Sequence, residues 1–281
     1  MNSQNIPSTI KQIMGQGISS QARRFTYCLI DDSSETKVGT AVAIQMGSRF
    51  FLATAAHVIR NAETIKAVVQ DQVISYVSDF NAKYYDSCSD IGLLEVSSSD
   101  SHRFNFLSAY RLCKKIDDEK KLPVMVVGFA GQFSKPVKRI QLTIDNILPI
   151  VYCNTLTCGT VVLPSSEWPS EELPDENGMY KKLVDGRDML IDFEPEPKVT
   201  PFTSQSTGTE NPRVACQSLY PHGMSGGGIW LAQIREGPEK LDSPDAQLIG
   251  LQIGWHRSKN LLHGIRIGVW LDFVSDRYPG P

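Results

Sequence analysis

The chain has 281 residues, of which 28 are Lys or Arg and 31 are Asp or Glu, giving a formal net charge of −3, and 41% of the residues are hydrophobic. This length leaves room for one large domain or two modest ones, and the apolar fraction is ordinary for a globular protein. Because no concentrated block of basic residues is present, a nucleic-acid partner is not expected.

The six cysteines and the absence of targeting patterns predict a cytoplasmic protein with reduced thiols. There is no CxxC pair and no histidine spacing suited to zinc, so no metal site is expected. Cys153 and Cys158 could bridge across a turn or share a metal, but two half-buried reduced thiols are favoured over both alternatives. The first residues lack a charged start with an apolar core, and no stretch reaches the ~18 apolar residues of a membrane span. No membrane partner is therefore expected.

The first half of the chain changes from helical to strand periodicity. Ile10, Ile13 and Met14 have helical spacing, which predicts a short helix in an N-terminal extension, residues 1–23. Short runs rich in β-branched and aromatic residues follow, separated by Asp, Ser and Gly clusters. The predicted strands are 24–30, 39–46, 49–58, 67–70, 74–80 and 91–96. Strands at this spacing predict that residues 24–115 form a β-sandwich or a β-barrel.

A second β unit is predicted over residues 122–281, after the charge-rich connection 113–121. Its predicted strands are 123–131, 138–148, 157–163, 227–234, 246–255 and 264–270. Between them the segment 164–214 is rich in Pro, Glu, Ser and Thr, which predicts a set of inserted surface loops. The apolar spacing near the C-terminus allows a last helical turn or two before Pro279.

Three short motifs carry candidate chemistry. In "FLATAAHVIR", residues 51–60, His57 follows an apolar strand-like run. In "PHGMSGGGIW", residues 221–230, glycines flank Ser225, so that backbone N–H groups can surround a developing oxyanion while a neutral imidazole accepts the hydroxyl proton. Asp90 opens the apolar run of "SCSDIGLLEV", where a carboxylate could fix the tautomer of an imidazole. The Ser225 motif alone is also explained by a glycine-rich turn and Asp90 alone by a turn or cap, but the three motifs together indicate an acyl-transfer site.

These motifs resemble those of the chymotrypsin-like serine peptidases. "TAAH" at 54–57, "DIGLL" at 90–94 and "GMSGG" at 223–227 match the three family motifs in the family's order of histidine, aspartate and serine. The resemblance implies an all-β fold of two six-stranded antiparallel β-barrels with the site in the cleft between them. It also implies peptide-bond hydrolysis of a protein or peptide substrate through an acyl-enzyme, with no metal or organic cofactor.

The resemblance assigns a role to each motif residue. Ser225 is the nucleophile, His57 the general base and then acid, and Asp90 orients His57, while the N–H groups of Gly223 and Ser225 form the oxyanion hole. In addition, Leu219 corresponds to the base of the primary pocket, which favours an apolar or small substrate side chain. The extended segment containing Gln252, Ile253 and Gly254 is expected to bind the substrate backbone by strand addition.

The remaining histidines are not expected to react. His222 and His256 could pair with an acidic substrate side chain, but two exposed rings are favoured. His102 and His263 follow polar or loop sequence and are expected to be solvated.

Two departures from the secreted members bear on regulation. Val58 replaces a disulfide cysteine after the histidine, and Met224 replaces the aspartate that pairs with a new N-terminus in zymogen-activated members. The resemblance therefore implies an intracellular, microbial enzyme that is constitutively formed or switched by an activating partner or by the 164–214 segment, with bacterial defence as one hypothesis. The alternatives are a catalytically silent peptide- or protein-binding module of the same fold, and a β-sandwich with coincidental motifs.

Overall fold

A computed structural model describes residues 17–31, 36–62, 64–70, 74–77, 80–143, 146–174, 180–193, 221–233 and 245–279. Residues 17–24 are helical and lead into the first strand. The helix predicted around residues 10–14 lies outside the described residues. None of the described helices is long and apolar enough to cross a membrane.

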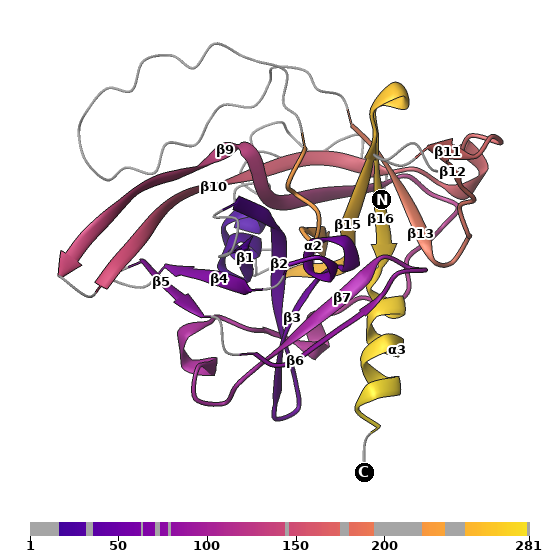
Figure 1. Cartoon of the computed structure of the whole chain (residues 1–281). Helices are drawn as coiled ribbons and strands as arrows, with labels where there is room; N and C mark the ends of the chain where they lie inside the picture. Colours follow the sequence, from indigo (N-terminus) through magenta and orange to yellow (C-terminus); the bar gives the residue numbers. More distant parts are fainter. Residues whose placement is uncertain are drawn as a thin grey trace.

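The first unit is a curled antiparallel sheet, visible in indigo and purple in Figure 1. Its strands are β1 (Thr26–Asp31), β2 (Thr36–Met46), β3 (Arg49–Ala55), β4 (Ile65–Gln70), β5 (Ile74–Val77), β6 (Phe80–Asp86), β7 (Ile91–Val96) and β8 (Leu107–Ser108). The main path runs β5-β4-β1-β2-β3-β7-β6, and β8 pairs in parallel with β2. The near-continuous apolar run of β7 is buried at five of its six positions, whereas the mixed sequence of the edge strand β6 leaves most positions exposed.

The second unit is a closed antiparallel barrel with the order β10-β13-β16-β15-β14-β9. Its strands are β9 (Leu122–Thr143), β10 (Asn146–Val162), β13 (Asp188–Asp192), β14 (Gly228–Gln233), β15 (Asp245–His256) and β16 (Leu261–Arg266). β9 and β10 form a long hairpin whose outer part extends well beyond the barrel (Figure 1). β11 (Leu173–Pro174) and β12 (Tyr180–Lys181) form a separate two-stranded sheet, and Leu173 packs against Leu190 and Leu261 of the barrel. The predicted all-β class is confirmed; of the two predicted six-stranded barrels, the second is closed with six strands, and the first is a curled sheet.

Short helices complete the chain. They are α2 (Ala56–Arg60), α3 (Ile267–Arg277) and the 3-10 turns η2 (Ser101–Arg103), η3 (Ala109–Arg111), η4 (Ser165–Glu167) and η5 (Arg257–Lys259). The predicted strand 49–58 is too long, because β3 ends at Ala55 and α2 begins at Ala56. The predicted strand 264–270 is also wrong beyond Arg266, because α3 begins at Ile267 and extends for 11 residues, longer than the last turn or two expected.

The prediction that residues 164–214 form only surface loops is wrong for β13. The sequence of β13, "DMLID", is short and lies within Pro-rich and Glu-rich surroundings, so its strand signal was weak. In the fold it closes the barrel between β10 and β16, and its first four residues are buried. Barrel closure, a non-local effect, therefore decides the structure of this stretch.

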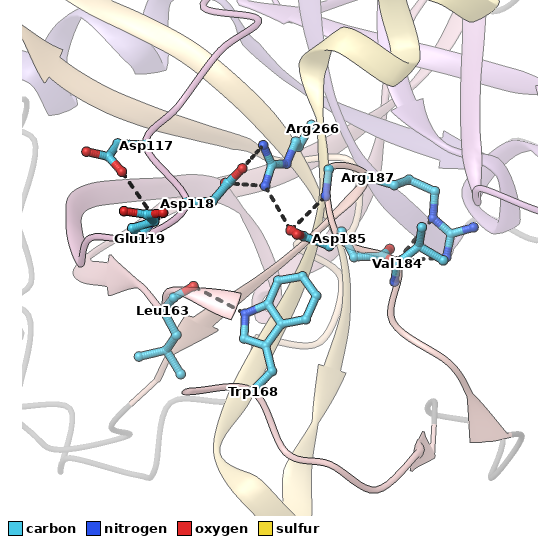
Figure 2. Close-up of polar contacts among 11 residues, drawn as sticks. Asp117, Asp118, Glu119, Leu163, Trp168, Val184, Asp185, Arg187 and Arg266 are labelled. Atoms are coloured by element: carbon cyan, nitrogen blue, oxygen red, sulfur yellow. Dashed lines mark hydrogen bonds and ion pairs between the residues drawn. The ribbon is translucent and has the colours of Figure 1, made fainter. Parts of the chain in front are cut away.

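Two features join the units. The largest hydrophobic cluster contains residues of both, for example Leu52 of β3 together with Trp230 of β14 and Trp270 of α3. The connecting segment is in turn held by an ion pair: Arg266 at the end of β16 donates to both carboxylate oxygens of Asp118. Figure 2 shows the same guanidinium facing Asp185, 3.9 Å away, in the turn before β13.

Candidate active site

His57 is positioned by the abrupt end of β3. The strand stops at Ala55, the backbone turns into α2, and His57 lies in the first turn of this five-residue helix. The N–H of Ala56 donates to the carbonyl of Asp90 at 3.1 Å, which ties the start of α2 to the turn before β7. Since Ala55, Ala56 and Val58 are buried while the His57 side chain is 39% exposed, the helix presents the ring at the surface.

Asp90 holds both the backbone and the ring of His57. Its Oδ1 accepts the His57 N–H at 3.0 Å, and its Oδ2 lies 2.8 Å from His57 Nδ1. Asp90 adopts φ of 52°, an uncommon left-handed conformation that aspartate tolerates better than most residues. The turn is supported by Asp86, whose carboxylate accepts the N–H groups of Cys88 and Ser89. With Nδ1–H donating to the carboxylate, the neutral ring offers Nε2 as a base.

Ser225 lies in a tight turn before β14 that depends on two glycines. Gly223 and Gly226 have φ of 85° and 87°, a region closed to most side chains. The turn is closed by the N–H of Met224 donating to Pro221 at 2.9 Å and by the N–H of Gly227 donating to Met224 at 2.7 Å. It is also joined to β15, because the N–H of Gly226 donates to the carbonyl of Gln252 at 2.7 Å.

The His57 segment and the Ser225 turn meet on strand β2. A Cβ added at Gly39 would lie 2.6 Å from Val58, the residue after His57, and 3.0 Å from the carbonyl oxygen of Ser225. Only a glycine therefore permits this approach of both segments to β2. Ser225 is 6% exposed, and its hydroxyl makes no hydrogen bond within the described part of the chain.

The predicted substrate-binding residues are placed in part. Gln252 is buried beside the Ser225 turn, its N–H donating to Gly227 at 2.8 Å, and Ile253 packs in the large core cluster. β14 pairs with β15 as far as Leu251, while β16 continues to pair with β15 through His256. Gly254 belongs to this second stretch, and Leu219 lies outside the described residues.

The histidine expectations are corrected in two cases. His222 and His102 are exposed, as favoured. The interpretation of His256 as exposed and of His263 as solvated is wrong, because their side chains are buried, and the two rings stack with centroids 5.4 Å apart. The burial has two causes: both residues lie on paired strands, and His256 Nδ1 lies 2.7 Å from the carbonyl of Pro174, in the segment that covers this side of the barrel.

Asp188, which sequence reasoning did not single out, is the partner of His263. Asp188 Oδ1 lies 2.9 Å from His263 Nε2, and Oδ2 accepts from Arg187 at 2.7 Å and from the Val184 N–H at 2.6 Å. Burial alone would raise the pKa of Asp188, but the hydrogen bonds from His263 and Arg187 outweigh it and leave this pKa below its usual value. The pairing of β13 with β16, absent from any local motif, brings the two residues together.

The described residues contain no group of three or more His, Cys, Asp or Glu side chains that could hold a metal ion. Cys28, Cys88, Cys113 and Cys158 are free thiols, and burial raises the pKa of Cys158 to about 12. The side chain of Cys153 lies outside the described part of the chain, but Cys158, the other member of the candidate bridge, is a free thiol.

Comparison with solved structures identifies the fold. Rv3671c from M. tuberculosis, solved as an inactive serine-to-alanine variant, aligns with a TM-score of 0.52 and 14% identity over 96% of this chain and 95% of that chain. The MamO protease domain of Magnetospirillum magneticum aligns with a TM-score of 0.49 and 10% identity over 90% of this chain and 96% of that chain. No protein-family model and no curated protein matches the sequence. The chain therefore has the chymotrypsin-like fold, and its reaction must be argued from its own residues.

Proposed function

We propose that the chain is a serine endopeptidase that hydrolyses peptide bonds through an acyl-enzyme on Ser225. The observation that carries the proposal is the pair of hydrogen bonds that the Asp90 carboxylate accepts from the backbone N–H and the ring Nδ1 of His57, on a segment that meets the Ser225 turn at β2. A ring fixed at Nδ1 in this way is what a general base for a serine requires. The chymotrypsin-like fold supports the same reading.

The proposed reaction uses only side chains and backbone of this chain. The Ser225 hydroxyl oxygen attacks the substrate carbonyl carbon while His57 Nε2 takes the hydroxyl proton, and the Asp90 carboxylate stabilises the resulting imidazolium. The N–H groups of Gly223 and Ser225 donate to the oxyanion. Collapse breaks the C–N bond, and the leaving amine takes the proton from His57. Water, activated by His57, then hydrolyses the ester and restores Ser225.

The substrate is a protein or peptide that adds as a strand to the Gln252–Gly254 stretch of β15. Support comes from the position of this stretch, which hydrogen-bonds directly to the Ser225 turn and lies beyond the end of the β14 pairing. Main-chain hydrogen bonds would supply affinity, and a preference for an apolar or small side chain is proposed because Leu219 corresponds, by the sequence resemblance, to the base of the primary pocket.

A regulated intracellular enzyme is part of the same proposal, with bacterial defence as its hypothetical setting. The residue before Ser225 is Met224, which is buried against Gly128 in the barrel core. An apolar side chain there offers no carboxylate to a newly cut N-terminus, so control by a partner protein or by the 164–214 segment is favoured over trimming.

One observation favours the alternative, a silent binding module of the same fold: the Ser225 hydroxyl has no hydrogen bond among the described residues. Catalytic hydrogen bonds are often long before substrate binds, so this geometry does not exclude the enzyme.

Labelling with a fluorophosphonate probe decides between the two. Purified protein is treated beside the variants Ser225→Ala and His57→Ala and is analysed by intact mass and peptide mapping. Stoichiometric labelling of Ser225 that both variants abolish supports the peptidase. A folded wild type that stays unlabelled, alone and after addition of candidate partner proteins, supports the silent module.

A further inference from the structure

One residue of the first unit, Thr40 on β2, binds the Ser225 turn at two points. Its N–H donates to the carbonyl of Ser225 at 2.8 Å, and its hydroxyl donates to the carbonyl of Gly223 at 3.2 Å. Thr40 is fully buried, and no sequence motif points to it. The turn between these two carbonyls contains Met224, so a single threonine fixes the turn on both sides of that residue.

Each anchored carbonyl belongs to the same residue as one of the two N–H groups proposed as oxyanion donors. Each peptide unit is planar, so holding a carbonyl fixes the orientation of its whole plane. The Gly223 carbonyl and the Ser225 carbonyl belong to the planes that adjoin those carrying the Gly223 and Ser225 N–H groups. Glycine at 223 could otherwise adopt several backbone conformations at similar free energy. The bonds to Thr40 select one of them.

Further contacts fix the position of Thr40 relative to the Ser225 turn. The Thr40 hydroxyl also accepts the N–H of Phe129 on β9 at 2.9 Å, which directs its proton toward Gly223. The Thr40 carbonyl accepts the hydroxyl of Thr54 at 2.7 Å. A Cβ added at Gly226 would lie only 1.9 Å from the Thr40 carbonyl oxygen, so the turn is seated directly on β2. Buried polar groups paired in this way are costly to leave unpaired.

We propose that Thr40 is a positioning residue for the reaction at Ser225: its hydroxyl, supplied by the first unit, holds the Gly223 carbonyl so that the oxyanion donors of the second unit keep their working orientation. This inference rests on the proposed function. Thr40 lies behind the turn and acts through it, so its loss should slow acylation without weakening the binding of the probe or substrate.

The test compares Thr40→Ser with Thr40→Ala, two variants that lose the same methyl group and differ only in the hydroxyl. The acylation rate at saturating probe and the apparent binding constant are measured separately for each. We expect Thr40→Ala to acylate about 10- to 100-fold more slowly than Thr40→Ser with binding constants within about threefold. Thr40→Ser should stay within about threefold of wild type. The matched control is Thr26→Ala, which removes a buried hydroxyl bonded to Ala22 elsewhere in the same sheet and should react like wild type.

Equal acylation rates in folded Thr40→Ser and Thr40→Ala would overturn the inference while leaving the peptidase intact. Should Thr40→Ala not fold, Thr40→Val is compared with wild type instead, because valine keeps the shape of threonine but has no hydroxyl to donate. A wild type that never reacts contradicts the proposed function instead. In that case amide hydrogen exchange over residues 221–233 still tests the anchoring: faster exchange in Thr40→Ala than in Thr40→Ser supports it, and identical exchange overturns it.

Discussion

The molecule contains two aspartate–histidine pairs of nearly equal length in very different surroundings. Asp90 and His57 are 2.8 Å apart, with the ring 39% and the carboxylate 15% exposed. Asp188 and His263 are 2.9 Å apart, with the ring 8% and the carboxylate 0% exposed. The distance between the ring nitrogen and the carboxylate oxygen therefore does not distinguish a reactive pair from a structural one. The two pairs differ in whether the ring nitrogen that does not face the carboxylate, Nε2 in His57 and Nδ1 in His263, can be reached by a reactant.

The carboxylates also differ in how they use their oxygens. Both oxygens of Asp90 bind the same residue, His57, once through its backbone and once through its ring. Asp188 divides its oxygens among His263, Arg187 and the Val184 backbone, joining β16 to β13 and to the turn before it. The first pair is built to orient one ring, and the second to hold several elements together. The predictions below test this division of roles.

Asp90→Asn should produce the largest effect, a loss of about 10⁴-fold in the acylation rate of Ser225, because an amide would hold His57 in the wrong tautomer. The free energy of unfolding should change by no more than about 1 kcal/mol, since the pair is partly exposed. Probe kinetics and urea unfolding measure the two quantities. A variant that acylates at the wild-type rate would remove Asp90 from the site.

Asp188→Ala should have the opposite effects: a large loss of stability and little change in the acylation rate of Ser225. Removing the carboxylate leaves Arg187 and His263 without their buried partner, and the free energy of unfolding should fall by about 3–5 kcal/mol. The protein that remains folded should acylate within a few-fold of wild type. Urea unfolding together with probe kinetics, each corrected for the folded fraction, gives the comparison. A stable variant with greatly slowed acylation would contradict a structural role for Asp188.

The contrast also shows what the sequence could supply. His57, Asp90 and Ser225 were proposed because short local motifs surround each of them, and the hydrogen bond between His57 and Asp90 agrees with that grouping. Asp188 and His263 were missed because no local pattern marks a pair 75 residues apart that meets only when β13 joins β16. The all-β class followed from alternating strand sequences, whereas β13 itself is stabilised by barrel closure.

Thr40 illustrates the same limit at the site. Its strand was predicted, within residues 39–46, but nothing in "VGTAVAI" distinguishes this threonine from Thr54 or from any other strand threonine. The role proposed for it depends on contacts with residues more than 180 positions away, which only the packing of the two units creates. Glycines were the better signal, since Gly223 adopts the positive φ expected for the Ser225 turn, and Gly226 adopts one as well.

The contribution of the Asp188–His263 pair to the free energy of unfolding should decrease at low pH. Because the pKa of Asp188 is lowered in the folded protein by His263 and Arg187, its contribution is present above the unfolded-state pKa of about 3.9 and is lost as pH falls through the lower folded value. Urea unfolding at several pH values between about 5 and 3 should show a smaller decrease for Asp188→Asn than for wild type. Asp272→Asn, an exposed change on α3, should follow wild type. Parallel curves for all three proteins would contradict this linkage.

The smallest effect concerns chemical access to the rings. Diethyl pyrocarbonate should modify His57 at least about tenfold faster than His263 or His256 in the folded protein, because acylation of an imidazole requires an exposed nitrogen and the latter two rings are buried. Peptide mapping against reaction time measures each residue, with exposed His102 as an internal reference. In urea all the rates should converge. Modification of His263 as fast as His57 under native conditions would mean that the second pair also opens to solvent, and the distinction between a reactive and a structural aspartate–histidine pair would then fail.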